Sequence, residues 1–417
     1  MRRLYRGNTG KLRLRAHAVA GCALLVSGLV LASGGVAYAT FSGTYNGNIA
    51  FIAICDTTNV GQAVYSINPD NTSPAYSCPG GSNPYTQSTQ GTNGIDSMPF
   101  FSAAGSTQYL YFASNRPSGS NTNFAIYQLP YPSTVSGSPG SQTDGATQLT
   151  SPPTGSNDYA PTVSADGTKL AFIRCGGSPS TCDLYIQSPI TTGTATEVST
   201  DFALEAPATV GGEANRPEFD PANSSEIIYV GTDGHIHLVT LNSSNQATGE
   251  VDLSSESGLP SGDAAQYPDW NPNGNSIIFD SDQVPTGNTN TGSGDFVWKL
   301  SVSGTSATES AVWGTHDPGN EIEPIFAPTG TEYAWTQEGA GTSGTNIQLD
   351  EGTSVTSPTV LLTDNKTNNS QPAWQPSSTP GTGTPEAPNV LLLPAAGILV
   401  GGAGWLAIAA RRRRTAS

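Results

Sequence analysis

Residues 158–172 read DYAPTVSADGTKLAF, and the pattern in this stretch recurs along most of the chain. A proline, a spacer and a bulky apolar residue (161–163) precede a tight turn (164–167), and large residues then flank a small one in 170–172. Alternation with a period of two is typical of a β-strand, and Ser, Asp and Gly are typical of a chain-reversing turn. The stretch therefore predicts two antiparallel strands joined by a hairpin turn.

The same unit occurs six times, and in each copy a further β-rich run follows the second strand. The prolines of the six copies are Pro99, Pro161, Pro217, Pro268, Pro324 and Pro372. Two positions after each proline stands a large apolar residue, which we interpret as a buried anchor: Phe101, Val163, Phe219, Trp270, Phe326 and Trp374. A repeat of roughly 50 residues with three or four strands per copy indicates the blades of a β-propeller.

The two ends of the repeat complete each other. The first unit has candidate strands at 49–51 and 63–65 but no proline strand, whereas the last copy has only the proline strand at 372–374. We therefore predict an all-β, six-bladed propeller in which the C-terminal strand pairs beside the N-terminal strands. This pairing closes the ring and leaves no sheet edge open. A solenoid with frayed ends is the alternative.

The repeated unit resembles that of a known protein family. The copy at 158–172, which continues to DLY at 183–185, and the stretch YPDWNPNG at 267–274 resemble the WD-like repeat of TolB-like six-bladed propellers. The resemblance covers residues 47–376. It implies a periplasmic or surface interaction module, and the same repeat is also found in peptidases and in some polysaccharide lyases.

The N-terminal segment has the pattern of an export signal. Residues 1–17 contain six Lys and Arg and no acid, and an apolar run follows up to a small-residue site at Ala37 to Ala39. These features predict a signal peptide at 1–39 and a mature propeller domain at 40–376. Arg2 and Arg3 leave twin-arginine export open as an alternative to the general secretory route.

The C-terminal segment has the pattern of a membrane anchor. Residues 377–388 are rich in Pro, Gly and Thr and predict a flexible stalk. An uncharged apolar stretch at 389–410 is long enough to span a bilayer, and the four arginines of the tail at 411–417 should remain cytoplasmic. This end resembles the tails of exported actinobacterial proteins, so we expect the propeller outside the cell, anchored in the membrane.

Charge and cysteine content agree with export. Residues 40–410 contain six basic and 33 acidic residues, a formal net charge of −27, which disfavours nucleic-acid binding. Cationic partners, calcium in the acid-rich loops, or solubility alone remain as explanations of this charge. The four cysteines after the signal peptide predict two disulfides, Cys55 with Cys78 and Cys175 with Cys182, over the alternative of a zinc site.

Catalytic and metal-binding motifs are weak. His235 and His237 flank Ile236 and should lie on one side of a strand, but His237 occupies a position that is aromatic in other blades. We therefore predict a structural role for His237 and no metal site. The sequence contains no Gly-x-Ser-x-Gly nucleophile motif, so we predict neither an enzyme nor a cofactor.

The remaining candidate site is the mouth of the propeller. We expect residues just before the innermost strands to form a polar, mostly acidic recognition surface: Asp96, Asp158, Arg216, Tyr267, Glu321 and Glu323. The alternative is that these side chains only cap strand ends. We predict a monomeric interaction or scaffold module that binds an envelope protein. A protein that binds or cleaves a surface glycan is the alternative, with carboxylates of the mouth as acid and base.

Overall fold

The computed structural model of the protein describes parts of the chain between residues 47 and 376, all within the compact unit Tyr38–Ser417. The described residues are 47–55, 61–70, 75–79, 81, 83–90, 94–102, 108–116, 123–132, 135, 144–176, 181–198, 204, 206–210, 213–254, 264–283, 294–311, 320–338, 345–350, 360–363 and 368–376. The predicted signal peptide, stalk, membrane helix and basic tail lie outside these ranges. Within them, no helix is long and apolar enough to cross a membrane.

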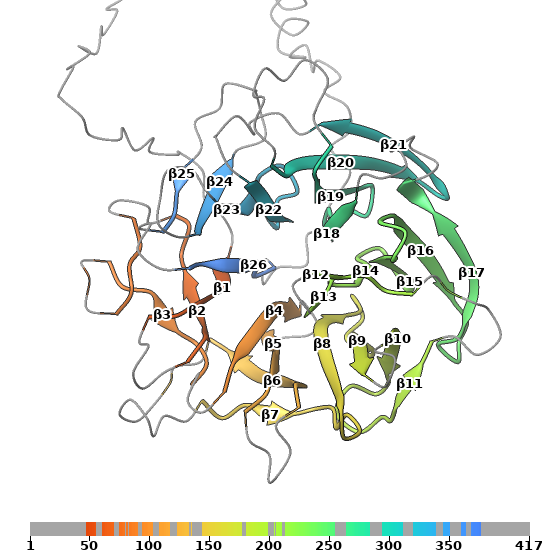
Figure 1. Cartoon of the computed structure of the whole chain (residues 1–417), viewed down its shortest axis with the longest axis horizontal. Helices are drawn as coiled ribbons and strands as arrows, with labels where there is room; N and C mark the ends of the chain where they lie inside the picture. The colour runs from red at the N-terminus through yellow and green to blue at the C-terminus, as the bar shows by residue number, and fades with distance from the viewer. Residues whose placement is uncertain are drawn as a thin grey trace, which may run out of the picture. The chain divides into compact units, whose positions relative to one another are not determined.

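Six four-stranded antiparallel sheets surround a common centre, and each is one blade of a propeller (Figure 1). Blade one contains β26 (Ser370–Trp374), β1 (Ile49–Ala53), β2 (Ala63–Ile67) and β3 (Thr86–Gln87). Blade two contains β4 (Asp96–Ser102), β5 (Gln108–Ser114), β6 (Ala125–Tyr131) and β7 (Thr147–Gln148). Blade three contains β8 (Ser156–Val163), β9 (Leu170–Gly176), β10 (Thr181–Gln187) and β11 (Ala195–Glu197).

The second half of the ring repeats this arrangement. Blade four contains β14 (Glu218–Asp220), β15 (Asn223–Val230), β16 (Ile236–Leu241) and β17 (Ala247–Asp252). Blade five contains β18 (Ala265–Trp270), β19 (Ser276–Ser281), β20 (Phe296–Ser303) and β21 (Ser306–Ala311). Blade six contains β22 (Asn320–Phe326), β23 (Tyr333–Glu338), β24 (Asn346–Asp350) and β25 (Val360–Leu361). A separate hairpin of β12 (Thr209–Val210) and β13 (Glu213–Ala214) precedes blade four.

The proline strand is the innermost strand of every blade, and the predicted closure is confirmed. Blade one combines β26 from the C-terminal part of the chain with β1 to β3 from the N-terminal part. Trp374 pairs with Ile49, and Ala373 pairs with Ala50. The first and last described strands therefore fasten the ring together, so β1 has a hydrogen-bonded partner on both sides.

Aromatic pairs between the second and third strands fill the space between blades. In blades two and three, Phe112 stacks on Tyr127 and Phe172 stacks on Tyr185, each with ring centroids 5.9 Å apart. The anchors predicted two positions after each proline are also buried, at 3–8 % exposure. The large residues of the alternating sequence pattern therefore lie on the strand faces that pack against neighbouring blades.

The hairpin turns and the disulfides also follow the sequence predictions. Gly167, Gly274 and Gly330 adopt positive φ angles of 68°, 73° and 77°, which explains why the turns carry glycine there. Both predicted disulfides are present, and Cys175 lies directly opposite Cys182 in the register of β9 and β10. Two disulfides indicate folding in an oxidising compartment outside the cytoplasm.

The closure predicts that loss of β26 opens the ring. A variant that ends after residue 368 should expose the edge of β1, and we expect aggregation and loss of a single cooperative unfolding transition. A variant that ends after residue 384 keeps β26 and is the matched control. Size-exclusion chromatography and thermal unfolding of the two purified variants test this, and a monomeric, cooperatively folded shorter variant would contradict it.

Candidate binding site in the central channel

A strained residue precedes the proline of the innermost strand in five of the six blades. Positive φ angles between 46° and 56° occur at Met98, Ala160, Tyr267, Glu323 and Gln371. At each of these positions the register of the strand pair shifts, as in a β-bulge. Residues other than glycine rarely adopt this conformation, and such strain persists only where the surrounding structure enforces it.

Side chains of neighbouring blades accept hydrogen bonds from the N–H groups at these bulges. The Met98 N–H donates to Gln371 Oε1 over 2.6 Å, and the Gln371 N–H donates to Glu323 Oε2. The Glu323 N–H donates to Asp280 Oδ1 over 3.0 Å, and the Tyr267 N–H donates to Asn215 Oδ1 over 3.1 Å. In all four cases the acceptor belongs to the preceding blade or to the segment that leads into it. These bonds fix the strained backbone and join the blades around the axis.

The bulges bring three of the six predicted mouth residues together. Arg216, Tyr267 and Glu323 line a narrow cavity of about 20 Å³, together with Met98 and Gln371. These residues lie within or directly beside the innermost strands, rather than in loops that precede them. The cavity is about large enough for one water molecule.

The other three predicted residues are buried within their own blades. Asp96 accepts two hydrogen bonds from Arg116 Nη2, at 2.8 and 2.9 Å, and Asp158 accepts two from Arg174, at 2.6 and 2.9 Å. Glu321 is 1 % exposed. The two aspartates are thus neutralised by arginines that also lie over the stacked aromatic rings of blades two and three. The role of these acids in recognition remains a prediction.

Burial dominates the electrostatics of Glu323. It raises the pKa of this carboxyl group to about 7, although hydrogen bonds from the Gln371 N–H and the Thr336 hydroxyl oppose the shift. Glu338 raises it further and Arg216 lowers it. Glu323 therefore exchanges its proton near neutral pH while it holds the bulge of blade one in place.

A larger cavity, of about 330 Å³, lies at the end of the channel that carries the turns between the first two strands of the blades. Its walls are the aromatic anchors and its rim is formed by turn residues, of which Ala165 and Pro272 are exposed. Binding pockets for small ligands typically measure about 300 to 1,000 Å³ and are mostly apolar with a few polar groups. The lining residues are Phe100, Phe101, Val163, Ser164, Ala165, Arg216, Glu218, Phe219, Pro221, Asp269, Trp270, Pro272, Phe326, Pro328, Ala373, Trp374 and Pro376.

Two carboxylates, the half-buried Glu218 and the buried Asp269, contribute to this cavity and to the contacts between blades. Glu218 Oε2 accepts a hydrogen bond from the backbone N–H of Trp270 over 2.6 Å, and Asp269 Oδ2 accepts one from the backbone N–H of Phe326 over 2.8 Å. Burial, and then the charge of Asp269, raise the pKa of Glu218 well above its usual value. Burial likewise raises the pKa of Asp269 to about 6, although Arg216 opposes the shift. Burial therefore favours the protonated form of both carboxyl groups, and the charge of Arg216 opposes this at each of them.

Arg216 lines both cavities and contacts blades on two sides of the channel. Its Nη2 atom lies 3.2 Å from Asp269 Oδ1 of blade five, and its Nη1 donates to the Pro99 carbonyl of blade two over 3.5 Å. Its Nε atom and the Nε1 atom of Trp270 are buried and have no hydrogen-bond partner in the described part of the chain. Both atoms are shielded from solvent, so the side chain of Arg216 contributes to the cavity wall through its ion pair with Asp269.

The sequence predictions missed Glu218, Asp269 and the cavity itself. Both carboxylates stand at the spacer position, directly after the proline. The repeat pattern predicts a role only for the large apolar residue that follows them. The anchors were assigned to packing alone, whereas Phe219 and Trp270 also form cavity walls. The sequence signal that could have indicated these two residues is an ionisable side chain at the spacer position of the innermost strand. In the other four copies this position is Phe100, Thr162, Ile325 or Ala373.

Comparison with known proteins identifies the fold. No protein-family model matches the chain, and no curated protein matches it. Hydrazine synthase from Kuenenia stuttgartiensis matches with a TM-score of 0.53 and 12 % identity, over 80 % of this chain and 47 % of that one. A putative TolB from Agrobacterium tumefaciens matches with 0.43 and 15 %, over 80 % and 100 % of the chains. An oligogalacturonate lyase from Vibrio parahaemolyticus matches with 0.41 and 12 %, over 72 % and 90 %.

Of these three matches only that to hydrazine synthase has a TM-score above 0.5, and at 12 % identity it bears on the fold alone. The chain spans about half the length of the hydrazine synthase chain. At such low identities the enzymes among these structures give no evidence of catalysis by this protein.

The raised pKa of Glu323 predicts a pH-dependent stability. Between about pH 4.5 and 7 the folded protein keeps a proton on Glu323 that the unfolded chain releases, so the free energy of unfolding falls as the pH rises. Glu323→Gln keeps an oxygen acceptor without the charge. We expect it to be more stable than the wild type by about 1–3 kcal/mol at pH 8 and close to it at pH 4.5.

Urea unfolding of both proteins at the two pH values measures this difference. Glu197→Gln, at an exposed position of blade three, is the matched control and should show no pH-dependent difference from the wild type. A Glu323→Gln variant equally destabilised at both pH values would show that the bulge depends on the ionised carboxylate.

Proposed function

We propose that the protein is an extracytoplasmic binding module that takes an apolar side chain of a partner protein into the 330 Å³ cavity. The single observation that supports this function most strongly is a cavity of this size whose walls are mostly aromatic side chains and prolines. An inserted apolar side chain would cover the aromatic rings of these walls. The two disulfides support an oxidising location for this activity.

The chemistry of the lining favours a protein partner over a glycan. A sugar ring carries a hydroxyl group on most of its carbons, and each buried hydroxyl needs a hydrogen-bond partner. The cavity presents few side chains with polar atoms, namely Ser164, Arg216, Glu218, Asp269 and the two tryptophans. Glu218 and Asp269 each accept a backbone N–H, and Asp269 is also paired with Arg216. An apolar side chain therefore fits this lining better than a sugar.

Membrane anchoring through residues 389–410 belongs to the same proposal. An anchored propeller would hold its cavity at the cell surface, where envelope proteins are at high effective concentration. Recognition through Asp96, Asp158 and Glu321 is a separate possibility that the mouth hypothesis retains. The buried position of all three favours the opposite end of the channel as the binding face.

A substitution at the rim of the cavity tests the proposal without disturbing the core. Ala165 is an exposed rim residue in the turn between the first two strands of blade three, so Ala165→Arg should obstruct the cavity. Ala222 is exposed in the corresponding turn of blade four but does not line the cavity, so Ala222→Arg is the matched control. We expect at least a tenfold loss of affinity, about 1.4 kcal/mol, for the first variant and less than a twofold change for the second.

The measurement is capture from a cell-envelope extract, followed by titration of the captured partner against the three purified proteins. Protease treatment of the extract distinguishes the classes of partner. Material that survives protease and depends on Ala165 would indicate a glycan and would overturn the choice of a protein partner. Equal binding by all three proteins would show that the cavity is not the binding site.

A further inference from the structure

Blade four carries a group of ionisable side chains that the central channel does not use. The whole chain contains four histidines, and two of them, His235 and His237, lie within three residues here. Asp233 lies in the turn between β15 and β16, and Glu250 and Asp252 lie on the outermost strand β17. The register pairs His237 with Asp252 and Val239 with Glu250, which brings the two strands' side chains together.

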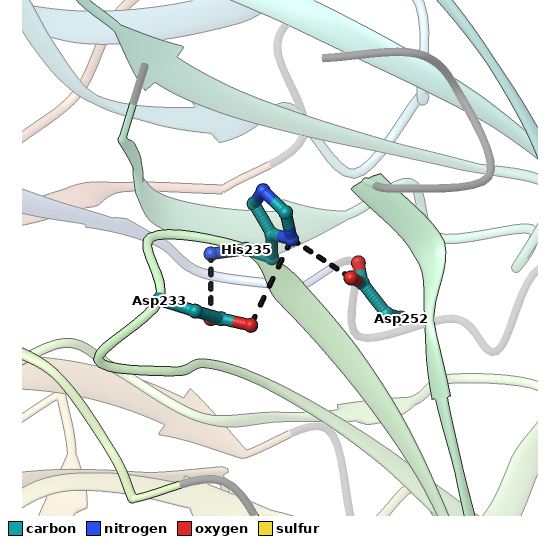
Figure 2. A group of neighbouring side chains, drawn as sticks. All are labelled: Asp233, His235 and Asp252. Carbon is teal, nitrogen blue, oxygen red and sulfur yellow. Dashed lines mark hydrogen bonds and ion pairs between the residues drawn. The ribbon is translucent and has the colours of Figure 1, made fainter. Parts of the chain in front are cut away.

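Three of these side chains converge on one point. His235 Nδ1 lies 2.7 Å from Asp252 Oδ2 and 3.7 Å from Asp233 Oδ2, and Figure 2 shows this ring nitrogen between the two carboxylates. One ligand atom of each residue lies within 4.8 Å of those of the other two. Metal–ligand distances of about 2.0–2.2 Å to nitrogen and oxygen place ligand atoms about 3–4 Å from one another. The observed separations bracket this range, so an ion could bind with small side-chain movements.

The group is accessible from solvent yet held in position. The side chains of His235, Asp252 and Asp233 are 17 %, 29 % and 37 % exposed. The Asp233 carboxylate accepts the His235 backbone N–H over 3.0 Å, and both of its oxygens lie 3.1 Å from His237 Nε2. Metal-binding carboxylates are commonly oriented by such outer hydrogen bonds.

His237 is in turn fixed by its own surroundings. Its ring stacks on Tyr229 with centroids 5.5 Å apart, and its Nδ1 lies 3.3 Å from Glu250 Oε1. This is the structural aromatic role that the sequence predicted for His237. The pair weighed in the sequence, His235 with His237, is therefore not the ligand set. Asp233 and Asp252 lie beside the ring of His235 instead, and His237 supports Asp233 from behind.

We propose that Asp233, His235 and Asp252 bind a divalent transition-metal ion, with Zn²⁺ as the ion that fits best. One imidazole nitrogen and two carboxylate oxygens suit zinc, and three protein ligands leave a position for water or a partner's side chain. Calcium prefers six to eight oxygen ligands, so this mixed set disfavours it. The strongly acidic chain would also raise the local concentration of cations.

The alternative is that His235 only forms ion pairs with the two aspartates, and a binding measurement separates the two cases. The purified full chain, stripped of metal with EDTA and dialysed, is titrated with Zn²⁺ against a fluorescent chelator. We expect one ion per chain, at least tenfold weaker binding by His235→Gln and by Asp252→Asn, and a smaller loss for His237→Phe. Asp183→Asn, which removes a carboxylate from a strand of blade three, is the matched control and should bind as the wild type does.

Two further measurements keep the proposal testable if a variant folds poorly. Zn²⁺ should raise the thermal unfolding temperature of the wild type in proportion to its logarithmic concentration, and the shift should be lost in Asp252→Asn. X-ray absorption of the zinc-loaded wild type should show one imidazole together with oxygen ligands. No binding by the wild type, equal binding by the His235 and Asp252 variants, or a spectrum without imidazole would overturn the proposal.

Discussion

The hydrogen bonds that bulged backbone N–H groups donate to the preceding blade are the interaction on which this propeller depends. A blade's own strands satisfy most backbone groups through the sheet ladder, and a bulge removes one N–H from that ladder. Gln371, Glu323 and Asp280 accept these freed N–H groups across blade boundaries. Four of the five strained residues, Met98, Tyr267, Glu323 and Gln371, therefore depend on the preceding blade or on the segment that leads into it, which couples blade formation to closure of the ring. The pairing of β26 with β1 completes this coupling because Gln371 itself lies on β26.

The same constraint shapes the channel. The bulge residues Met98 and Glu323 line a cavity of about 20 Å³, whereas the cavity lined by the anchors and the turns measures about 330 Å³. There the spacer carboxylates Glu218 and Asp269 accept N–H groups of the next blade, and they do so in a buried setting that raises their pKa values. Burial of acids is costly unless they are paired, and Arg216 supplies one partner for the two. The carboxylates of the cavity, Glu218 and Asp269, are thus present because they join the blades. The cavity could bind a ligand without additional structural elements.

The fold was predictable from the sequence for a physical reason. Proline, anchor and turn recur because every blade packs against its neighbours in the same way. Six weak local patterns therefore combine into one strong indication of a propeller. The closure was predictable because the first unit lacks a proline strand and the last copy consists of that strand alone. The site was less predictable, because a left-handed residue before proline leaves no mark in the sequence when its side chain is Met98, Tyr267 or Gln371. The direction of a side chain at a bulge depends on that backbone angle. Arg216, Tyr267 and Glu323 line one cavity, whereas the arginines that neutralise Asp96 and Asp158 lie on the second strand of the blade or just after its end.

Blade four departs from the repeat in three places, and these departures coincide with the chemistry. Arg216, the residue before its proline, keeps a negative φ while its five counterparts have positive values, and its side chain reaches blades two and five. The extra hairpin of β12 and β13 leads into this blade, and Asn215 beside it accepts the bulge N–H of blade five. On the outer side, His237 replaces the tyrosine of blades two and three, and Asp233 and Asp252 gather beside His235. Packing alone favours uniform blades, so residues that break uniformity need another explanation, and function is the usual one. A repeat protein can acquire a specific site by altering one blade while the other five preserve the ring.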